Sequence, residues 1–178
     1  MRCSAVLLAG GKSSRMGRDK AFLEFAGEPL WRRQLATLRK LSPEQLMISG
    51  SRREEWIEYE IVSDEIADAG PLAGVTAALQ NCTAPLLVVL AVDLPRMTAN
   101  FLRSLEHGAV PHGPDGFEPL AAVYPVTCLS LARESLRSGD FSMQNLVRMA
   151  IEQGLLSERE ISESECSLFS NLNTPADL

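Results

Sequence analysis

Cys3-Ser4-Ala5-Val6-Leu7-Leu8 runs directly into Ala9-Gly10-Gly11-Lys12-Ser13-Ser14-Arg15-Met16-Gly17-Arg18-Asp19-Lys20. The apolar run predicts a strand that is buried on both faces of a parallel sheet. The glycines of the following loop let backbone N–H groups approach an anion without interference from a side chain. Four cations also lie in this loop, at positions 12, 15, 18 and 20. The segment therefore predicts a strand followed by a phosphate-binding loop.

Two widespread phosphate loops do not fit this segment. A P-loop that ends in Gly11-Lys12-Ser13 needs a glycine five positions before Gly11, and position 6 is Val6. A dinucleotide-binding fingerprint needs the spacing G-x-G-x-x-G, whereas Gly10 and Gly11 are adjacent. The remaining interpretations are a nucleotide site of another class and a solvated turn with scattered charge.

The composition is that of an ordinary globular protein. The chain has 178 residues, of which 46% are hydrophobic, so it can bury a sizeable core. Its 17 basic and 23 acidic residues give a net charge of −6, which argues against nucleic acid as a partner of the whole surface. We find neither an apolar run that could span a bilayer nor a signal-peptide pattern, and we expect a cytoplasmic protein without a membrane partner.

Expected strands and helices alternate along the chain, which predicts an α/β fold. We expect a single domain over residues 1–178, with a doubly wound, mostly parallel sheet whose central strand is the apolar run Leu86–Val92. The expected strands are Ser4–Leu8, Gln45–Ser49, Ile61–Val62, Leu86–Val92, Glu118–Tyr124 and Cys166–Phe169. The expected helices are Pro29–Leu41, Arg52–Trp56, Pro71–Leu79, Thr98–His107, Val126–Leu136 and Ser142–Glu152.

A lone acid, Asp93, follows the expected central strand and precedes Leu94-Pro95. Ligands of doubly wound sheets bind outside the carboxyl ends of the strands, where the loops 10–20, 63–70 and 93–98 would meet. A carboxylate there is costly unless it is compensated, and Mg²⁺ is a suitable compensator in a phosphate site. A turn or N-cap role for Asp93 is the alternative. Combined with the phosphate loop, the position favours a metal ligand.

The segment 63–74 is a third candidate element of the site. Asp64 ends a short strand, and Gly70-Pro71 then opens a helix whose free N–H groups favour anions. Asp64 could accept a hydrogen bond from a ribose hydroxyl or from the N–H edge of guanine. On spacing alone, a plain turn with a solvated acid is the simpler interpretation.

Residues 8–20 read L-A-G-G-x-S-x-R-M-G-x-D-K, and this pattern resembles the opening of the molybdenum cofactor guanylyltransferase family. The resemblance continues in G-P-L-A-G at residues 70–74 and D-x-P at 93–95. It also includes E-P-L-x-A-x-Y at 118–124 and N-x-N-T-P at 171–175. It implies a Rossmann-like sheet of the nucleotide-diphospho-sugar transferase type.

The resemblance also implies which residues form the site. The nucleotide would be bound by Leu8, Ala9, Gly10, Gly11, Lys20, Ser49, Asp64, Gly74 and Asp93. The catalytic residues would be Arg15, Lys20 and Asp93, and Asp93 would also bind Mg²⁺. Ser49 departs from the family, which often has asparagine there. A hydroxyl lacks the two-sided hydrogen bonding of an amide, so a base contact at Ser49 would be shorter or water-mediated.

The C-terminal half would contain the residues that bind the second substrate. By resemblance, Asn171 and Asn173 lie near a pterin, whose edge presents donors and acceptors that suit an amide pair. A helix entry with turn-forming asparagines is the alternative. For Glu118, a site role and an edge-strand charge are equally supported.

The implied reaction is transfer of GMP from GTP to molybdopterin, or to its molybdenum-bound form, with release of pyrophosphate. Transfer of CMP from CTP to the same pterin is one alternative. A non-catalytic nucleotide-binding or cofactor-delivery protein of the same fold is another, although Lys20 and Asp93 together argue against it. The implied protein partners are transient: proteins that handle molybdopterin, and molybdoenzymes.

Overall fold

A computed structural model describes residues 1–10, 19–63 and 69–172. The strands are β1 (Cys3–Leu8), β2 (Glu24–Phe25), β3 (Glu28–Pro29), β4 (Gln45–Ser49), β5 (Glu60–Val62), β6 (Leu86–Ala91), β7 (Ala109–Gly113), β8 (Gly116–Phe117), β9 (Ala121–Pro125) and β10 (Ser157–Glu160). The α-helices are α1 (Leu30–Arg39), α2 (Pro71–Asn81), α3 (Ala99–Arg103), α4 (Leu129–Ser138) and α5 (Met143–Glu152). The 3-10 helices are η1 (Lys20–Phe22), η2 (Glu54–Trp56), η3 (Val126–Cys128) and η4 (Glu163–Phe169).

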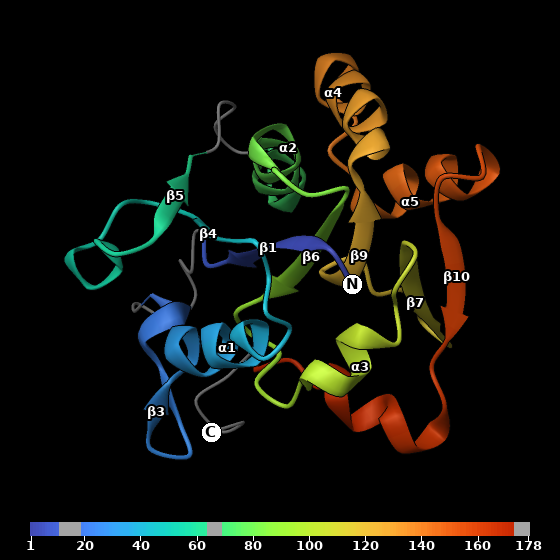
Figure 1. Cartoon of the computed structure of the whole chain (residues 1–178). Coiled ribbons are helices and arrows are strands. Elements are labelled where there is room, and N and C mark those ends of the chain that lie inside the picture. Colours follow the sequence, from blue (N-terminus) through green and yellow to red (C-terminus); the bar gives the residue numbers. More distant parts are fainter. Residues whose placement is uncertain (11–18, 64–68, 173–178) are drawn as a thin grey trace.

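Within the described residues, one mixed sheet forms the centre of the structure (Figure 1), with the strand order β10-β7-β9-β6-β1-β4-β5 and β8 paired to β7. β1 runs parallel to both of its neighbours, β4 and β6, and β5 runs parallel to β4. β9 is antiparallel to β6 and to β7, while β10 is parallel to β7. The predicted mostly parallel α/β sheet is confirmed, and β6 is its central strand.

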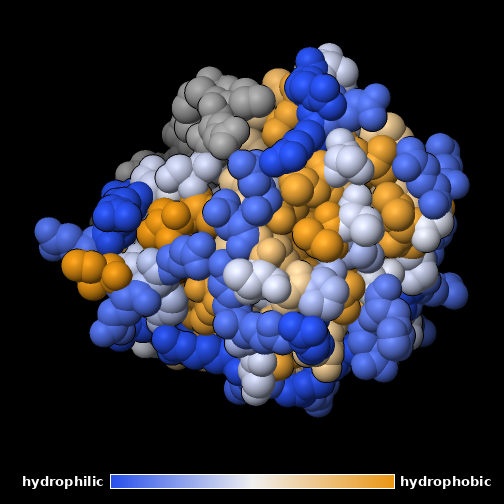
Figure 2. Space-filling view, turned by 45° about the horizontal axis from the view of Figure 1, so that its top comes forward, coloured by the Kyte–Doolittle hydropathy of each residue, from blue (hydrophilic) through white to orange (hydrophobic). Residues whose placement is uncertain are grey.

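Helices cover both faces of this sheet, with α1 and α3 on one side and α2, α4 and α5 on the other (Figure 1). β1 serves both layers, because Ala5 and Leu7 pack toward α1 while Val6 and Leu8 pack toward α2. This two-sided burial explains its unbroken apolar sequence. Figure 2 brings the α2, α4 and α5 side forward and shows hydrophobic residues interspersed with hydrophilic ones. No helix in the described ranges is both long and apolar enough to cross a membrane.

One expected strand was wrong, and the strands β7 and β10 were not predicted. The segment Cys166–Phe169 lies in the 3-10 helix η4, because Glu165 accepts hydrogen bonds from the Ser162 backbone N–H and from Arg159 and so starts a helical turn. β7 was missed because Pro111 interrupts it, and proline weakens a strand pattern. β10 was missed because its sequence, Ser-Glu-Arg-Glu, has no apolar residue on either face.

Two helices begin at capping side chains, and the first of these helices is shorter than expected. The Thr98 hydroxyl accepts a hydrogen bond from the Phe101 N–H, and Ser142 caps α5 in the same way. α3 nevertheless ends at Arg103 instead of extending to His107. His107 and Gly108 both have positive φ angles, so the chain turns there and enters β7.

An ion pair joins β10 to η4, and ring contacts fix both elements to α3. The Arg159 guanidinium donates to both carboxylate oxygens of Glu165, at 2.7 and 2.6 Å. Arg159 also lies 4.4 Å above the Phe101 ring, which packs edge-on against Phe169 at 5.2 Å. These contacts lead the chain to Leu172, whose N–H donates to the backbone carbonyl of Asp93 at 3.1 Å.

The Arg159–Glu165 pair should make stability depend on acid pH. Hydrogen bonding from Arg159 lowers the pKa of Glu165 to about 2. Because the folded pKa is lowered, this contribution is fully present above the ordinary value near pH 4.5 and is lost as the pH falls toward 2. We expect Glu165→Gln to lower the free energy of unfolding by about 1 kcal/mol at pH 7, with the difference shrinking between pH 5 and pH 3. Urea unfolding at several pH values measures it. Glu163→Gln, which neutralises another acid of the same turn, is the control, and an equal effect of both changes would contradict the assignment.

Candidate active site

The ends of β1, β4, β5 and β6 meet at one edge of the sheet and bring the predicted nucleotide-binding segments together. The N–H groups of Ala9 and Gly10 both donate to the Ser49 carbonyl, at 2.9 and 3.0 Å. On the other side, the Val92 N–H donates to the Leu8 carbonyl at 3.1 Å. Leu8, Ala9 and Gly10 therefore lie between the end of β4 and the end of β6, at the edge where ligands of such sheets bind.

Gly74 lies in α2 where that helix passes closest to the end of β4. A Cβ atom on Gly74 would lie 2.4 Å from the Ser49 hydroxyl oxygen and 3.3 Å from Leu8 Cδ2. Ser49 itself is only 3% exposed. The predicted grouping of Leu8, Ser49 and Gly74 is thus present, and glycine is what allows the helix to come this close.

Lys20 and Asp93, which are far apart in the sequence, form an ion pair across this edge. The Lys20 Nζ lies 3.4 Å from Asp93 Oδ2, and both side chains are about one quarter exposed, at 24% and 27%. Lys20 opens η1, whose N-cap Asp19 accepts a hydrogen bond from the Ala21 N–H at 3.1 Å. An ammonium and a carboxylate at this separation, open to solvent, can bind a phosphate and a cation.

Buried polar contacts hold the loop that carries Asp93. The Gln34 side chain is fully buried and donates to the carbonyls of Ala91 and Leu94, at 3.2 and 2.6 Å. Arg33 donates to the Pro95 carbonyl at 2.6 Å. Because these carbonyls flank Asp93 on both sides, α1 fixes the backbone from which the carboxylate projects.

Gln34 and Glu118 are residues of this site that sequence reasoning missed or left undecided. Gln34 is spaced four residues from Leu30 and from Leu38 on the buried stripe of α1, so a polar residue facing the core was a readable signal. Glu118 follows the β6–β9 register, which places it opposite Asp93 when continued past Leu90 and Ala121. Burial raises the pKa of the Glu118 carboxyl, and the charges of Asp115 and Asp93 raise it further.

The donor chemistry at this edge fits a hard divalent cation. Asp93 offers carboxylate oxygens of the kind that Mg²⁺ prefers, and its side chain is 27% exposed, so it is accessible to water. Among the described residues, no group of three or more histidine, cysteine or acidic side chains is arranged to hold a metal.

The remaining predicted residues are only partly described. Asn171 precedes Leu172, the residue whose N–H binds the Asp93 carbonyl, so the structure brings Asn171 to the predicted site. The other four predicted residues lie outside the described ranges: Gly11, Arg15, Asp64 and Asn173.

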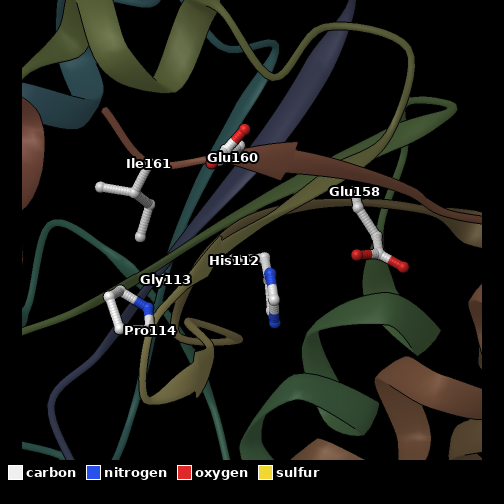
Figure 3. A pocket seen from close by; sticks show the side chains of 6 residues that line it. All are labelled: His112, Gly113, Pro114, Glu158, Glu160 and Ile161. Atoms are coloured by element: carbon white, nitrogen blue, oxygen red, sulfur yellow. The ribbon is translucent and has the colours of Figure 1, made fainter. Parts of the chain in front are cut away.

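A separate hollow lies between β7 and β10, two strands away from β6 (Figure 3). It is lined by His112, Gly113, Pro114, Glu158, Glu160 and Ile161. Figure 3 shows that the Glu158 and Glu160 side chains spread apart instead of converging on His112. This hollow therefore offers no catalytic arrangement comparable to the Lys20–Asp93 pair.

Comparison with known proteins identifies the family. The MobA-like NTP transferase domain matches residues 5–154. The chain belongs to this family. A probable molybdenum cofactor guanylyltransferase of Opitutus terrae is 40% identical over 98% of this chain and 92% of its own length. The molybdenum cofactor guanylyltransferase of Xanthomonas euvesicatoria pv. vesicatoria is 36% identical over 97% of this chain and 90% of its own length.

Solved structures show the same fold. The molybdopterin-guanine dinucleotide biosynthesis protein A of Archaeoglobus fulgidus superposes with a TM-score of 0.76 at 24% identity, covering 98% of this chain and 94% of that one. The 2-C-methyl-D-erythritol 4-phosphate cytidylyltransferase of Thermus thermophilus gives 0.70 at 17% identity, covering 99% and 95%. Together with the family match, the resemblance to the molybdenum cofactor guanylyltransferases is confirmed, and the MobA-like chain is an enzyme, a nucleotidyltransferase.

The close approach at Gly74 gives a direct test of the site's packing. We expect Gly74→Ala to lower the free energy of unfolding by about 1–3 kcal/mol, because its Cβ would overlap the Ser49 hydroxyl. The double variant Gly74→Ala/Ser49→Ala removes that oxygen and should recover a large part of the loss. Urea unfolding of both variants and of Ser49→Ala alone measures this coupling. A Gly74→Ala protein as stable as the parent would contradict the geometry.

Proposed function

We propose that this MobA-like enzyme transfers GMP from GTP to molybdopterin, or to its molybdenum-bound form, producing the guanine dinucleotide cofactor and pyrophosphate. The observation that carries the proposal is the Lys20–Asp93 pair at the carboxyl edge, where Ala9 and Gly10 follow β1. The names of the relatives from Opitutus terrae and Xanthomonas support the choice of guanine and of the pterin.

The chief obstacle to nucleotidyl transfer is repulsion between the attacking phosphate and the triphosphate. The Gly10 N–H already donates to the Ser49 carbonyl, so the backbone N–H groups that follow it, from Gly11 onward, would hold the triphosphate. Arg15 and Lys20 would offset its negative charge. Positioning and electrostatic stabilisation supply most of the catalysis in reactions of this kind. A side-chain nucleophile is not needed, because the attacking oxygen comes from the pterin's own phosphate.

Asp93 is the residue proposed to hold Mg²⁺, which would supply charge neutralisation to the phosphates when bound. The second ionisation of a phosphate monoester lies near pH 6, so the attacking group is largely a dianion at neutral pH. No general base is therefore required of this chain. Lys20, at 3.4 Å from Asp93, is placed to share the same phosphate oxygens.

The two ends of the proposed substrate complex follow from the sheet order. Ser49, Asp64 and Gly74 would surround the nucleoside, on the β4 and β5 side of β1. Asn171 and Asn173 would face the pterin on the β6 side, since the chain passes Asp93 at Leu172. The α-phosphate would then lie between these ends, above β1.

We also propose that the enzyme works in the cytoplasm and meets molybdopterin-handling proteins and molybdoenzymes only transiently. All four cysteines are free thiols: Cys3, Cys82, Cys128 and Cys166. Free thiols suit a reducing compartment, where disulfides are rare.

Nucleotide choice can be tested by thermal shift. With Mg²⁺ present, we expect GTP to raise the melting temperature more than CTP, ATP or UTP at the same concentration, since a ligand stabilises the folded state according to its affinity. Preferential stabilisation by CTP would instead support CMP transfer. The absence of any nucleotide preference would contradict the proposed base site.

Replacement of Asp93 tests the chemistry. We expect Asp93→Ala to lower the rate of pyrophosphate release by at least about 10²-fold, because one partner of the phosphate and metal site is lost. Stability should change by less than about 1 kcal/mol, since the Lys20–Asp93 pair is partly exposed. Asp115→Ala, which removes a nearby acid, is the matched control. Near-normal pyrophosphate release by Asp93→Ala would overturn the assignment, and binding that continues without turnover in the parent enzyme would favour a non-catalytic protein.

A further inference from the structure

An arginine in the loop after β4 is bound to the segment that carries Lys20. The Arg53 guanidinium lies 2.7 Å from Asp19 Oδ2. The other carboxylate oxygen of Asp19 accepts from the Ala21 N–H and so caps η1. One carboxylate thus joins the loop after β4 to the first turn of the helix that begins at Lys20.

Aromatic rings pack against this connection. Arg53 lies 6.0 Å above the Phe22 ring, and Phe22 stacks on Trp56 at 5.7 Å with an interplanar angle of 16°. Trp56 is buried and packs edge-on against Trp31 of α1 at 6.3 Å. The Arg53 carbonyl also accepts from the Trp56 N–H and so starts η2. Arg53 therefore connects η1 and η2: its side chain binds the N-cap residue of η1, and its carbonyl accepts the first hydrogen bond of η2.

Lys20 is enclosed by fixed neighbours. Asp19 is held by Arg53, Ala21 is fully buried, and Phe22 is stacked. The backbone at Lys20 therefore has little freedom, and its long side chain starts from a fixed point when it reaches Asp93. A lysine side chain carries up to about 2 kcal/mol of rotamer entropy, so a fixed starting point favours the productive geometry.

We propose that Arg53 is a positioning residue, which acts through Asp19 and η1 to hold the Lys20 ammonium in line with Asp93 and the transferred phosphate. The proposal rests on the proposed nucleotidyl transfer. It also links the two sides of the site, since Arg53 follows the loop from Ser49, the proposed base contact, while η1 carries the phosphate contact. Arg53 itself need not touch the nucleotide.

A stabilising role is the simpler explanation of such an ion pair, and exposure argues against it. The Arg53 and Asp19 side chains are 45% and 30% exposed, and pairs of this kind add little to stability. The geometry of a catalytic group is far more sensitive, because a displacement of about 1 Å can cost about 10²-fold in rate. Loss of Arg53 should therefore appear in turnover more than in folding.

The test compares Arg53→Ala with Arg53→Lys in the whole protein. We expect Arg53→Ala to lower kcat for pyrophosphate release by about 10- to 100-fold, with the KM for GTP changed less than about threefold. Arg53→Lys keeps the charge without the planar fork and should recover part of the loss. Hydrogen exchange read by mass spectrometry should show faster exchange over residues 19–23 in Arg53→Ala, and this readout does not depend on turnover.

Arg39→Ala is the matched control. Arg39 lies 5.3 Å above the ring of Tyr59, which packs edge-on against Trp31. Arg39 donates a hydrogen bond to the Tyr59 hydroxyl, whereas Arg53 binds Asp19. It should leave kcat and the exchange of 19–23 unchanged. Equal losses in both variants would assign the effect to the rings and overturn the proposal, as would unchanged kcat and exchange in Arg53→Ala. If the parent enzyme turns over GTP and Arg53→Ala does so at the same rate, only the positioning role is refuted. If the parent enzyme shows no turnover, the proposed function is refuted.

Discussion

The parallel pairing of β1 with both β4 and β6 is the constraint on which the site depends. Leu8 lies opposite Ser49 on one side and Ala91 on the other, so three successive loops leave the sheet at one point. Ala9 and Gly10 lie between the ends of β4 and β6, which carry the Ser49 hydroxyl on one side and the Asp93 carboxylate on the other. In the proposed function, this order sets nucleoside, phosphate and pterin along one line across the sheet.

The strands that could be predicted are those whose own burial dictates their sequence. β6 is apolar throughout, and β1 is apolar except for Ser4, because both faces of these strands are covered. The start of α2 could be predicted from Pro71 in its first turn. β7 and β10 could not be predicted, since Pro111 and the polar run Ser157–Glu160 are tolerated only because neighbouring strands supply the pairing. The 3-10 turn at 163–169 likewise depends on Arg159, a partner that the local pattern of that segment does not include.

For the site, the sequence predicted candidate residues but not the contacts that hold them in place. Lys20 and Asp93 were predicted separately from a loop motif and a strand end, and the fold brings them to 3.4 Å. Gln34 was readable as a polar residue on a buried stripe, yet its partners, the carbonyls of Ala91 and Leu94, belong to a distant segment that only the tertiary structure brings near. The roles of all the predicted site residues stay predictions, and Gly11, Arg15, Asp64 and Asn173 also lie outside the described residues.

The reversed direction of β9 has a consequence for how this enzyme class can diversify. Asp93 leaves β6 and Glu118 enters β9 at the same edge, and the ladder between these two strands sets their spacing. The chain between them, which forms α3, β7 and β8, departs from that edge and returns to it. Glu118 is also held by this connector, because its N–H donates to the Pro111 carbonyl of β7 at 2.8 Å. The parts of the connector outside β7 can change in length at little cost, because loop-closure entropy grows slowly with length. Those parts are therefore where a lineage can insert or delete segments and alter what docks beside the two acids, with the carboxyl edge of the sheet preserved.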